Sequence, residues 1–263
     1  MIKFSMLIER LVIKLKKDGV FGAIFGFLSM FSNKIKWRFL GKRLQGAVSS
    51  ESRFELIYNN NMWGSKESVS GFGSTLKYTE KLRAKLPSVI NSLGIGSILD
   101  APCGDFNWMK EVVRSFPNVS YIGADIVRDL VKVNNNKYGR DYISFVHLDI
   151  VKDQLPDVDL MICRDCLFHL CEEDILKFFA NFCRSNIKYL ITTSHDNELD
   201  QFCNVDIENG EFRLLDLFSS PYNLSSDFLF KIEDWMEPEP KRFMYLWSRS
   251  SIELAFSKNQ LSK

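Results

Sequence analysis

The sequence lacks an uncharged run long enough to cross a membrane as a helix. The uncharged stretch 20–31 has twelve residues, whereas a helical span needs about 20. No small-residue cleavage site follows it, so neither a transmembrane segment nor a secretory signal is predicted. Internal repeats and low-complexity segments are also missing, and a composition of 46% hydrophobic and 25% charged residues is typical of a globular chain with one large core.

Disulfide and metal motifs are missing as well. Six cysteines do not make a disulfide framework in a chain of 263 residues without an export signal, so the sequence predicts a cytoplasmic protein. Cys163 and Cys166 form a Cys-x-x-Cys pair, but no second pair follows at zinc-finger spacing. Because Cys163 falls in an apolar run, we expect buried thiols here and no metal site.

A third absence concerns glycine. The pattern Gly-x-Gly-x-x-Gly, which binds the pyrophosphate of dinucleotides, does not occur. In its place residues 97–105 read Ser-Ile-Leu-Asp-Ala-Pro-Cys-Gly-Asp, an apolar strand that ends at Asp100 and turns sharply. Small residues at the carboxyl end of a strand let the backbone approach a ligand. The carboxylate of Asp100 would repel a pyrophosphate, so the turn predicts a cationic ligand.

Aspartates recur at the ends of the next two expected strands. Residues 121–125 end in Asp125, 25 residues after Asp100, and residues 143–149 end in Asp149, 24 residues later. The first interval fits one β-α-β unit, and helix-length material also precedes the third strand. An aspartate after a strand is also a common helix N-cap or turn residue. Three such aspartates in succession favour a shared ligand-binding edge over three separate caps.

The remaining pattern predicts an α/β fold. Residues 158–163 and 189–193 are expected as buried strands, separated by a helix with apolar positions Ile175, Phe178, Phe179 and Phe182. Residues 228–232 and 243–247, split by the turn 238–240, predict an antiparallel hairpin. The alternation indicates a Rossmann-like sheet of seven strands, mostly parallel, with right-handed crossovers and an antiparallel C-terminal hairpin.

Several blocks of the sequence resemble one family, the class I S-adenosylmethionine-dependent methyltransferases, in which an Asp/Glu-x-small-Cys-Gly turn follows the first strand. That turn is residues 100–104 here, with Pro102 and Phe106 at positions where glycines are usual. The resemblance spans residues 58–248 and is narrower than the superfamily, to bacterial methyltransferases found among surface-glycan biosynthesis genes. The blocks that carry it are 63–64, 67–68, 70–75, 99–109, 121–127, 163–170, 204–207, Gly210, Arg213 and 221–222.

The resemblance implies S-adenosylmethionine as the cofactor, and the chemistry of that molecule assigns roles to the expected site. Asp125 would accept hydrogen bonds from both ribose hydroxyls, and Asp149 from the adenine amine. Asp100 would face the cationic methionine end, and Ser70 and Gly71 would form a lid, with a flexible turn as the alternative. The cofactor-binding residues expected are Asp100, Ala101, Cys103, Gly104, Asp125, Ile126, Asp149, Ile150, Arg164, Ser70 and Gly71.

Catalytic residues are expected after the fourth strand, in residues 164–169. Methyl transfer to an alcohol requires removal of the hydroxyl proton, and Asp165 and His169 are the candidates for that step. At positions i and i+4 they would share one face of a helix, so the carboxylate could orient the imidazole. The alternative is that Asp165 caps the helix and His169 packs structurally. The second-rank candidates for binding the acceptor follow the fifth strand: His195, Asp196, Asn197 and Glu198.

Charge is concentrated at the N-terminus. Residues 1–45 hold ten Lys or Arg against Glu9 and Asp18, a balance of +8, so the net charge of +1 leaves −7 for residues 46–263. Apolar residues recur there at helical spacing with basic residues on another face, which predicts a helix lying on an anionic membrane surface. The alternative is an arm that packs on the core or on a sister subunit. An acidic core disfavours a nucleic-acid partner.

These observations predict a domain plan and a function. Residues 1–48 would form the basic amphipathic helical arm and residues 49–263 the methyltransferase domain. Within the domain we expect a helical lid in 49–92, a cofactor-binding core in 93–200, and a substrate-side insertion with closing strands in 201–263. The expected function is O-methylation of a glycan or sugar intermediate at the cytoplasmic face of the membrane. The alternatives are methylation of a small metabolite or amine, and a non-catalytic cofactor-binding interaction protein.

Overall fold

The computed structural model describes residues 46–47, 49–196 and 202–260. The expected arm, residues 1–48, falls almost wholly outside this range, as do Asn197 and Glu198. Among the described residues no helix is both long and apolar enough to span a membrane.

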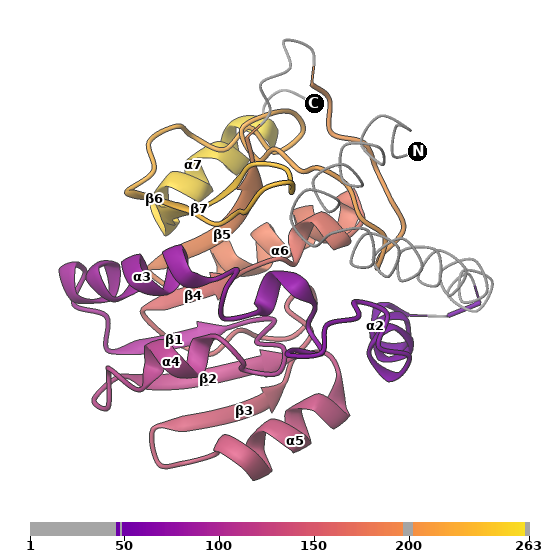
Figure 1. Cartoon of the computed structure of the whole chain (residues 1–263). Helices are drawn as coiled ribbons and strands as arrows, with labels where there is room; N and C mark the ends of the chain where they lie inside the picture. Colours follow the sequence, from indigo (N-terminus) through magenta and orange to yellow (C-terminus); the bar gives the residue numbers. More distant parts are fainter. Residues whose placement is uncertain (1–45, 48, 197–201, 261–263) are drawn as a thin grey trace. The chain divides into compact units, whose positions relative to one another are not determined.

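A seven-stranded sheet organises the described part of the chain, with strand order β3-β2-β1-β4-β5-β7-β6 (Figure 1). Strand β7 runs antiparallel to both of its neighbours, and every other pairing is parallel. The expected fold, a mostly parallel sheet with an antiparallel C-terminal hairpin, is therefore confirmed. The strands are β1 (Ser97–Asp100), β2 (Ser120–Asp125), β3 (Ile143–His147), β4 (Leu160–Cys163), β5 (Tyr189–His195), β6 (Phe230–Glu233) and β7 (Arg242–Ser248).

Helices cover both faces of the sheet. They are α2 (Ser50–Asn59), α3 (Glu80–Ser92), α4 (Met109–Val113), α5 (Arg128–Tyr138), α6 (Glu172–Arg184) and α7 (Arg249–Gln260), with short 3-10 turns η1 (Phe72–Ser74) and η2 (Leu167–His169). Successive strand residues alternate between the two faces. Leu99 and Met161 pack in one core with α6 and α7, whereas Ile98 and Ile162 pack in the other with α3 and α4. Burial on both faces explains why these strands are almost continuously apolar.

Helix α6 shows how the apolar spacing produces this packing. Its four expected core positions, Ile175, Phe178, Phe179 and Phe182, are all fully buried. Acidic residues occupy its first turn and Arg184 its last turn, a distribution that complements the helix dipole.

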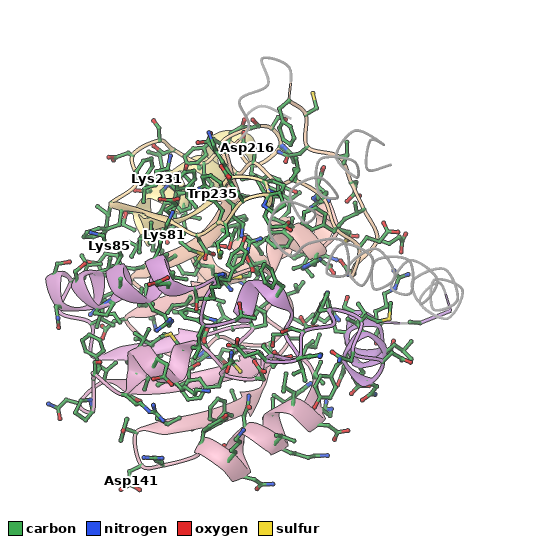
Figure 2. All side chains as sticks on the ribbon, viewed as in Figure 1. Lys81, Lys85, Asp141, Asp216, Lys231 and Trp235 are labelled. Carbon is green, nitrogen blue, oxygen red and sulfur yellow. The ribbon has the colours of Figure 1, made fainter. Side chains whose placement is uncertain are left out.

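Helix α3 lies against the C-terminal hairpin rather than over a cavity. Lys81 of α3 pairs with Glu233 of β6, and its ammonium lies 5.8 Å from the centre of the Trp235 ring (Figure 2). The expected lid of residues 49–92 therefore divides into segments with different surroundings. Helix α2 and residues 69–74 line a cavity that is described below, whereas α3 packs on the core.

The order of the strands determines where a ligand can enter. From β1 the chain moves outward through β2 to β3, and β4 then lies on the opposite side of β1. Such a reversal opens a crevice at the carboxyl ends of the two central strands, which is where open α/β sheets bind ligands.

Two expected strand ends differ from the structure. Strand β3 ends at His147, so Asp149 lies in the turn that follows, where its side chain accepts a hydrogen bond from the Val151 backbone N–H (3.0 Å). This local turn competes with continuation of the strand. His195 is the last residue of β5, paired in register with Arg242, instead of lying in the loop beyond it.

Candidate active site

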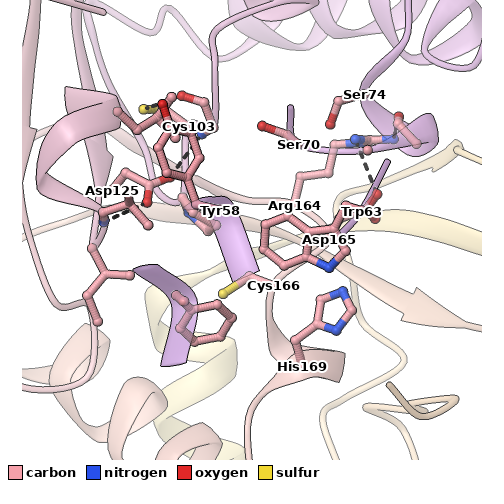
Figure 3. Close-up of a pocket in the computed structure, with 18 of the residues that line it drawn as sticks. Tyr58, Trp63, Ser70, Ser74, Cys103, Asp125, Arg164, Asp165, Cys166 and His169 are labelled. Carbon is pink, nitrogen blue, oxygen red and sulfur yellow. Dashed lines mark hydrogen bonds and ion pairs between the residues drawn. The ribbon is translucent and has the colours of Figure 1, made fainter. Parts of the chain in front are cut away.

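A cavity of about 380 Å³ opens at the carboxyl ends of β1, β2 and β4. It has two ends with different linings (Figure 3). We call the end around Asp100, 103–104, 125–126 and 149–150 the carboxylate half. The aromatic half is the end around Trp63, Tyr78, 164–165, 168–169, Phe212 and Arg242. Nearly every residue expected to bind cofactor or to act in catalysis lines this cavity; Ala101, which is fully buried beneath it, does not.

Asp100 is the buried acid at the end of β1. It is 2% exposed, and its Oδ2 accepts a hydrogen bond from the hydroxyl of Tyr121 (2.6 Å). Burial raises the pKa of Asp100 to about 7, although the Tyr121 bond and the charge of Arg164 oppose that shift. A carboxylate in such a place is stabilised by a cation, as the sequence predicts for this turn.

Asp125 is held by the backbone. Its two oxygens accept hydrogen bonds from the N–H groups of Gly104 (3.1 Å) and Val127 (3.0 Å). Burial raises the pKa of Asp125 to about 6, against the effect of these bonds. A carboxylate has about four lone-pair sites, so about two remain for a ligand that donates hydrogen bonds.

Asp149 lies at the same edge, on the loop after β3. Its carboxylate pairs with Lys152 (2.9 Å) as well as with the backbone of Val151, and it lines the cavity beside the apolar side chains of Ile126 and Ile150. The three aspartates expected at the strand ends therefore face one cavity.

Gly104 permits a close approach between two loops. It has φ +54°, and a Cβ at this position would lie 2.2 Å from the hydroxyl oxygen of Ser70. The next residue, Asp105, accepts hydrogen bonds from the Ser68 hydroxyl (2.9 Å) and the Val69 N–H (3.0 Å), while its own N–H donates to Ser70. The loop expected as a lid is thus fastened to the turn after β1.

Four charged residues from three segments form a network in the aromatic half. Arg164 makes a two-pronged ion pair with the fully buried Asp234 (2.8 and 2.9 Å) and also donates to the carbonyl of Gly73. Burial alone would lower the pKa of Arg164, but Asp165 and Asp234 raise it, so the guanidinium stays charged. Arg242 donates to the Asp234 carbonyl and to Oδ2 of Asp165 (2.8 Å).

The expected arrangement of Asp165 and His169 on one helix is wrong. Asp165 has φ +52°, outside the right-handed helical region, and only residues 167–169 form a 3-10 turn. The carboxylate of Asp165 points to Arg242 and Arg164, and no hydrogen bond joins it to His169 among the described residues. Burial alone would raise the pKa of Asp165, but the two guanidiniums hold it below its ordinary value. It is consequently a weak base.

His169 is oriented by a backbone carbonyl. Its Nδ1 lies 2.6 Å from the carbonyl oxygen of Glu211, which accepts the ring proton and leaves Nε2 with a free lone pair. Burial lowers the pKa of His169 below its ordinary value, so the ring is neutral near pH 7. The rings of Trp63 and Phe212 lie 5.8 and 6.0 Å from it. A neutral imidazole of fixed tautomer is suited to accept a proton.

Two of the second-rank acceptor candidates, His195 and Asp196, are described by the structure, and neither lines the cavity. His195 is 2% exposed and does not line it; its Nδ1 accepts the Leu215 N–H (3.1 Å), and burial lowers its pKa to about 4. Asp196 lies 3.8 Å from Lys231.

Sequence reasoning did not identify Tyr78, Phe212 and Arg242 as site residues. They come from three segments far from residues 164–169 in the chain, and only the pairing of β7 with β5 brings Arg242 beside Asp165. The one sequence signal was Arg242 itself, a charge at the head of an apolar strand. Among the described residues no group of three His, Cys, Asp or Glu side chains comes together as metal ligands.

Comparison with protein families finds a match to the central part of the chain. A family model described as a methyltransferase domain matches residues 98–186, which run from β1 to just past α6. No curated protein matches the chain. The match confirms the expectation of a methyltransferase enzyme.

Solved structures share the fold at low sequence identity. A SAM-dependent methyltransferase of Leishmania major is 14% identical, with 81% of this chain and 90% of that chain covered and a TM-score of 0.55. Magnesium protoporphyrin IX methyltransferase of Synechocystis PCC 6803, with bound SAH, is 13% identical, with 73% and 93% covered and a TM-score of 0.51. PigF with SAH is 16% identical, with 88% and 73% covered and a TM-score of 0.53. The structural similarity shows a common fold. At such low sequence identity it does not identify the molecule that this chain methylates.

Proposed function

We propose that this chain transfers the methyl group of S-adenosylmethionine to a hydroxyl group of a glycan or sugar intermediate. The observation that carries the proposal is His169, a neutral imidazole whose Nδ1–H is fixed on the Glu211 carbonyl and whose Nε2 is free. It lines the same cavity as three acidic side chains suited to hold the methyl donor.

The carboxylate half fits S-adenosylmethionine in its chemistry. Asp125 has lone pairs left for the ribose hydroxyls, and Asp149, which lines the cavity together with Ile126 and Ile150, would accept a hydrogen bond from the adenine amine. Asp100 suits the ammonium of the methionine end. Gly104 lines the cavity, and its lack of a side chain leaves room for the Ser70 loop to close on the turn after β1.

The residues of the aromatic half explain how a hydroxyl would be activated. Bound S-adenosylmethionine would supply an electrophilic methyl group on a cationic sulfonium, whose bond to the methyl carbon breaks on transfer and leaves a neutral thioether. As the new bond between oxygen and carbon forms, Nε2 of His169 takes the hydroxyl proton. The Glu211 carbonyl keeps the ring in the tautomer that has this lone pair, and the negative charge of Asp165 favours the imidazolium that results. Alignment of the two reactants supplies much of the remaining rate.

The rim of the aromatic half suits a sugar. Phe72 and Phe212 line the cavity and are 54% and 55% exposed, and Trp63 also lines it. Aromatic faces of this kind stack on the apolar C–H face of a pyranose ring. We also propose that the enzyme works at the inner face of the membrane, on the strength of the basic, amphipathic sequence of residues 1–45.

The proposal is tested with the purified chain and S-adenosylmethionine that has a deuterated methyl group. Surface saccharide extracted from cells that lack the gene serves as the acceptor, and saccharide from cells with the gene as the methylated reference. Mass spectrometry should show one deuterated O-methyl group at the position that is methylated in the reference. Identical saccharides from both kinds of cell, or label recovered on nitrogen, would contradict an O-methylated glycan product.

A further inference from the structure

Two polar atoms in the aromatic half have no hydrogen-bond partner among the described residues: the hydroxyl of Tyr78 and Oδ1 of Asp165. Both residues line the cavity, and Tyr78 is 3% exposed. Burying a polar group without a partner is costly, and such groups are rare in folded proteins. Two such atoms on residues that line a binding cavity therefore indicate that a bound ligand provides their hydrogen bonds.

Arg242 connects the two side chains. Its guanidinium lies 4.9 Å from the centre of the Tyr78 ring, and its Nη2 donates to Oδ2 of Asp165 (2.8 Å). Nη1 of Arg164 lies 3.3 Å from that same oxygen. One oxygen of Asp165 is thus used by the protein, and the other is not.

The backbone of Asp165 is held in a costly conformation. Its φ of +52° lies in the left-handed region, where a non-glycine residue is strained, and its N–H donates to the hydroxyl of Thr193 (3.0 Å). A Cβ on Gly73 would come within 2.8 Å of Oδ2, so the loop above the carboxylate has no room for another side chain. The surroundings fix Asp165 in one orientation, with Oδ1 as its free acceptor.

We propose that Tyr78 and Asp165 bind a second hydroxyl group of the acceptor, next to the one that is methylated, so that the acceptor is a diol or polyol. The inference rests on the proposed function and deepens it. A hydroxyl donates to Oδ1 and accepts from the Tyr78 O–H, which satisfies both atoms at once. A phosphate or carboxylate would be repelled by Asp165, and an acceptor with a single hydroxyl would leave both atoms unpaired.

Tyr78→Phe is the cleanest test, because it removes a hydroxyl that makes no bond to any described residue. The assay measures transfer from tritiated S-adenosylmethionine to the surface saccharide from cells lacking the gene, to methyl glycopyranosides, and to their mono-deoxy counterparts. We expect kcat/KM of Tyr78→Phe to fall about fivefold on the polyol and to be unchanged on the counterpart without the neighbouring hydroxyl. For Asp165→Asn the loss on the polyol should be about 30-fold, since the lost acceptor is charged.

Tyr189→Phe is the matched control, because Tyr189 begins β5 at the end of the sheet away from the cavity. It should leave transfer to both kinds of acceptor unchanged. Calorimetric affinity for S-adenosylmethionine reports whether Asp165→Asn is folded; if it is not, Tyr78→Phe decides alone.

Two results would overturn the inference, and they are distinguishable. If Tyr78→Phe lowers transfer equally to the polyol and to its deoxy counterpart, or lowers neither, Tyr78 does not recognise a second hydroxyl, while the proposed function stands. If the parent enzyme transfers no methyl group to any hydroxyl of the saccharide or the panel, the proposed function is wrong, and this inference falls with it.

Discussion

The carboxylate half and the aromatic half of the cavity differ in what holds their side chains. In the carboxylate half, Asp125 is held by backbone N–H groups, and the three aspartates lie at or just beyond strand ends within residues 97–150. In the aromatic half, Arg164, Asp165 and Arg242 are held mainly by one another and by Asp234, which brings together three distant segments. The carboxylate half is therefore determined locally, by the ends of neighbouring strands. The aromatic half forms only when the β6–β7 hairpin pairs with β5.

The difference implies that the two halves can be damaged separately. Changes to the three aspartates of the carboxylate half should alter cofactor affinity, because these side chains make the proposed contacts with the cofactor. Changes in the aromatic half should alter transfer or stability while the cofactor still binds.

The largest difference between the effect on turnover and the effect on cofactor affinity is expected at His169. His169→Ala removes the proton acceptor, so turnover should fall by about 10²–10⁴-fold with similar affinity for S-adenosylmethionine. In the parent, kcat should decrease as the pH falls through a pKa below the ordinary histidine range, because the protonated ring cannot accept a proton. Steady-state rates with calorimetric affinities check both effects. If His169→Ala turned over as fast as the parent, another residue would have to accept the hydroxyl proton.

Stability should depend most on the buried ion pair of the aromatic half. Asp234→Ala removes the two-pronged ion pair of the Arg164 guanidinium, which is 5% exposed, and should lower the free energy of unfolding by about 3–5 kcal/mol. Glu233→Ala is the matched control next to it. Its pair with Lys81 is exposed and should contribute less than about 1 kcal/mol. Urea unfolding measures both, and equal losses would show that the network does not stabilise the fold.

Cofactor affinity should depend on pH through the carboxylate half. The pKa of Asp100 is about 7 and that of Asp125 about 6, and each should favour its ionised form when a cation or hydroxyl donors bind. Affinity should therefore fall as the pH drops, by up to about tenfold per unit below pH 7 for Asp100 alone. Asp100→Asn should bind more weakly at pH 7.5 and lose most of this dependence. A parent affinity that is constant from about pH 5.5 to 7 would exclude an ionised Asp100 as the partner of the ammonium.

The smallest effect per residue is expected from the N-terminal arm. Residues 1–45 carry a balance of +8, and each basic residue near an anionic surface contributes about 1 kcal/mol. The full chain should sediment with anionic vesicles at low salt and be released at high salt, whereas a chain starting at Ser49 should stay in the supernatant and still bind S-adenosylmethionine. Equal sedimentation of both chains would indicate that the arm packs against protein.

The sequence predicts the carboxylate half well because its determinants are local. Alternating strands and helices place residues 100, 125 and 149 at one edge of any parallel sheet, whatever the distant packing. The error at Asp149 is a local turn that ends β3 two residues early.

The aromatic half could be predicted only in part. The spacing predicted Asp165 and His169 on one helix. In the structure Asp165 has a positive φ that no right-handed helix contains, and it pairs with the neighbouring Arg164 and with Arg242 from a distant segment. The carbonyl that orients His169 belongs to Glu211, 42 residues away. No periodicity encodes such contacts, because they depend on the path of the chain between β5 and β7.

Calorimetric titration of S-adenosylmethionine into the parent and into Asp125→Ala tests the central claim most directly, since everything proposed for the aromatic half requires the methyl donor in the carboxylate half. The account predicts one binding site on the parent, no binding of a nicotinamide dinucleotide, and a loss of about 1–3 kcal/mol in Asp125→Ala, where the ribose hydroxyls lose their acceptor. Undiminished affinity in Asp125→Ala, or a parent that does not bind S-adenosylmethionine, would contradict it.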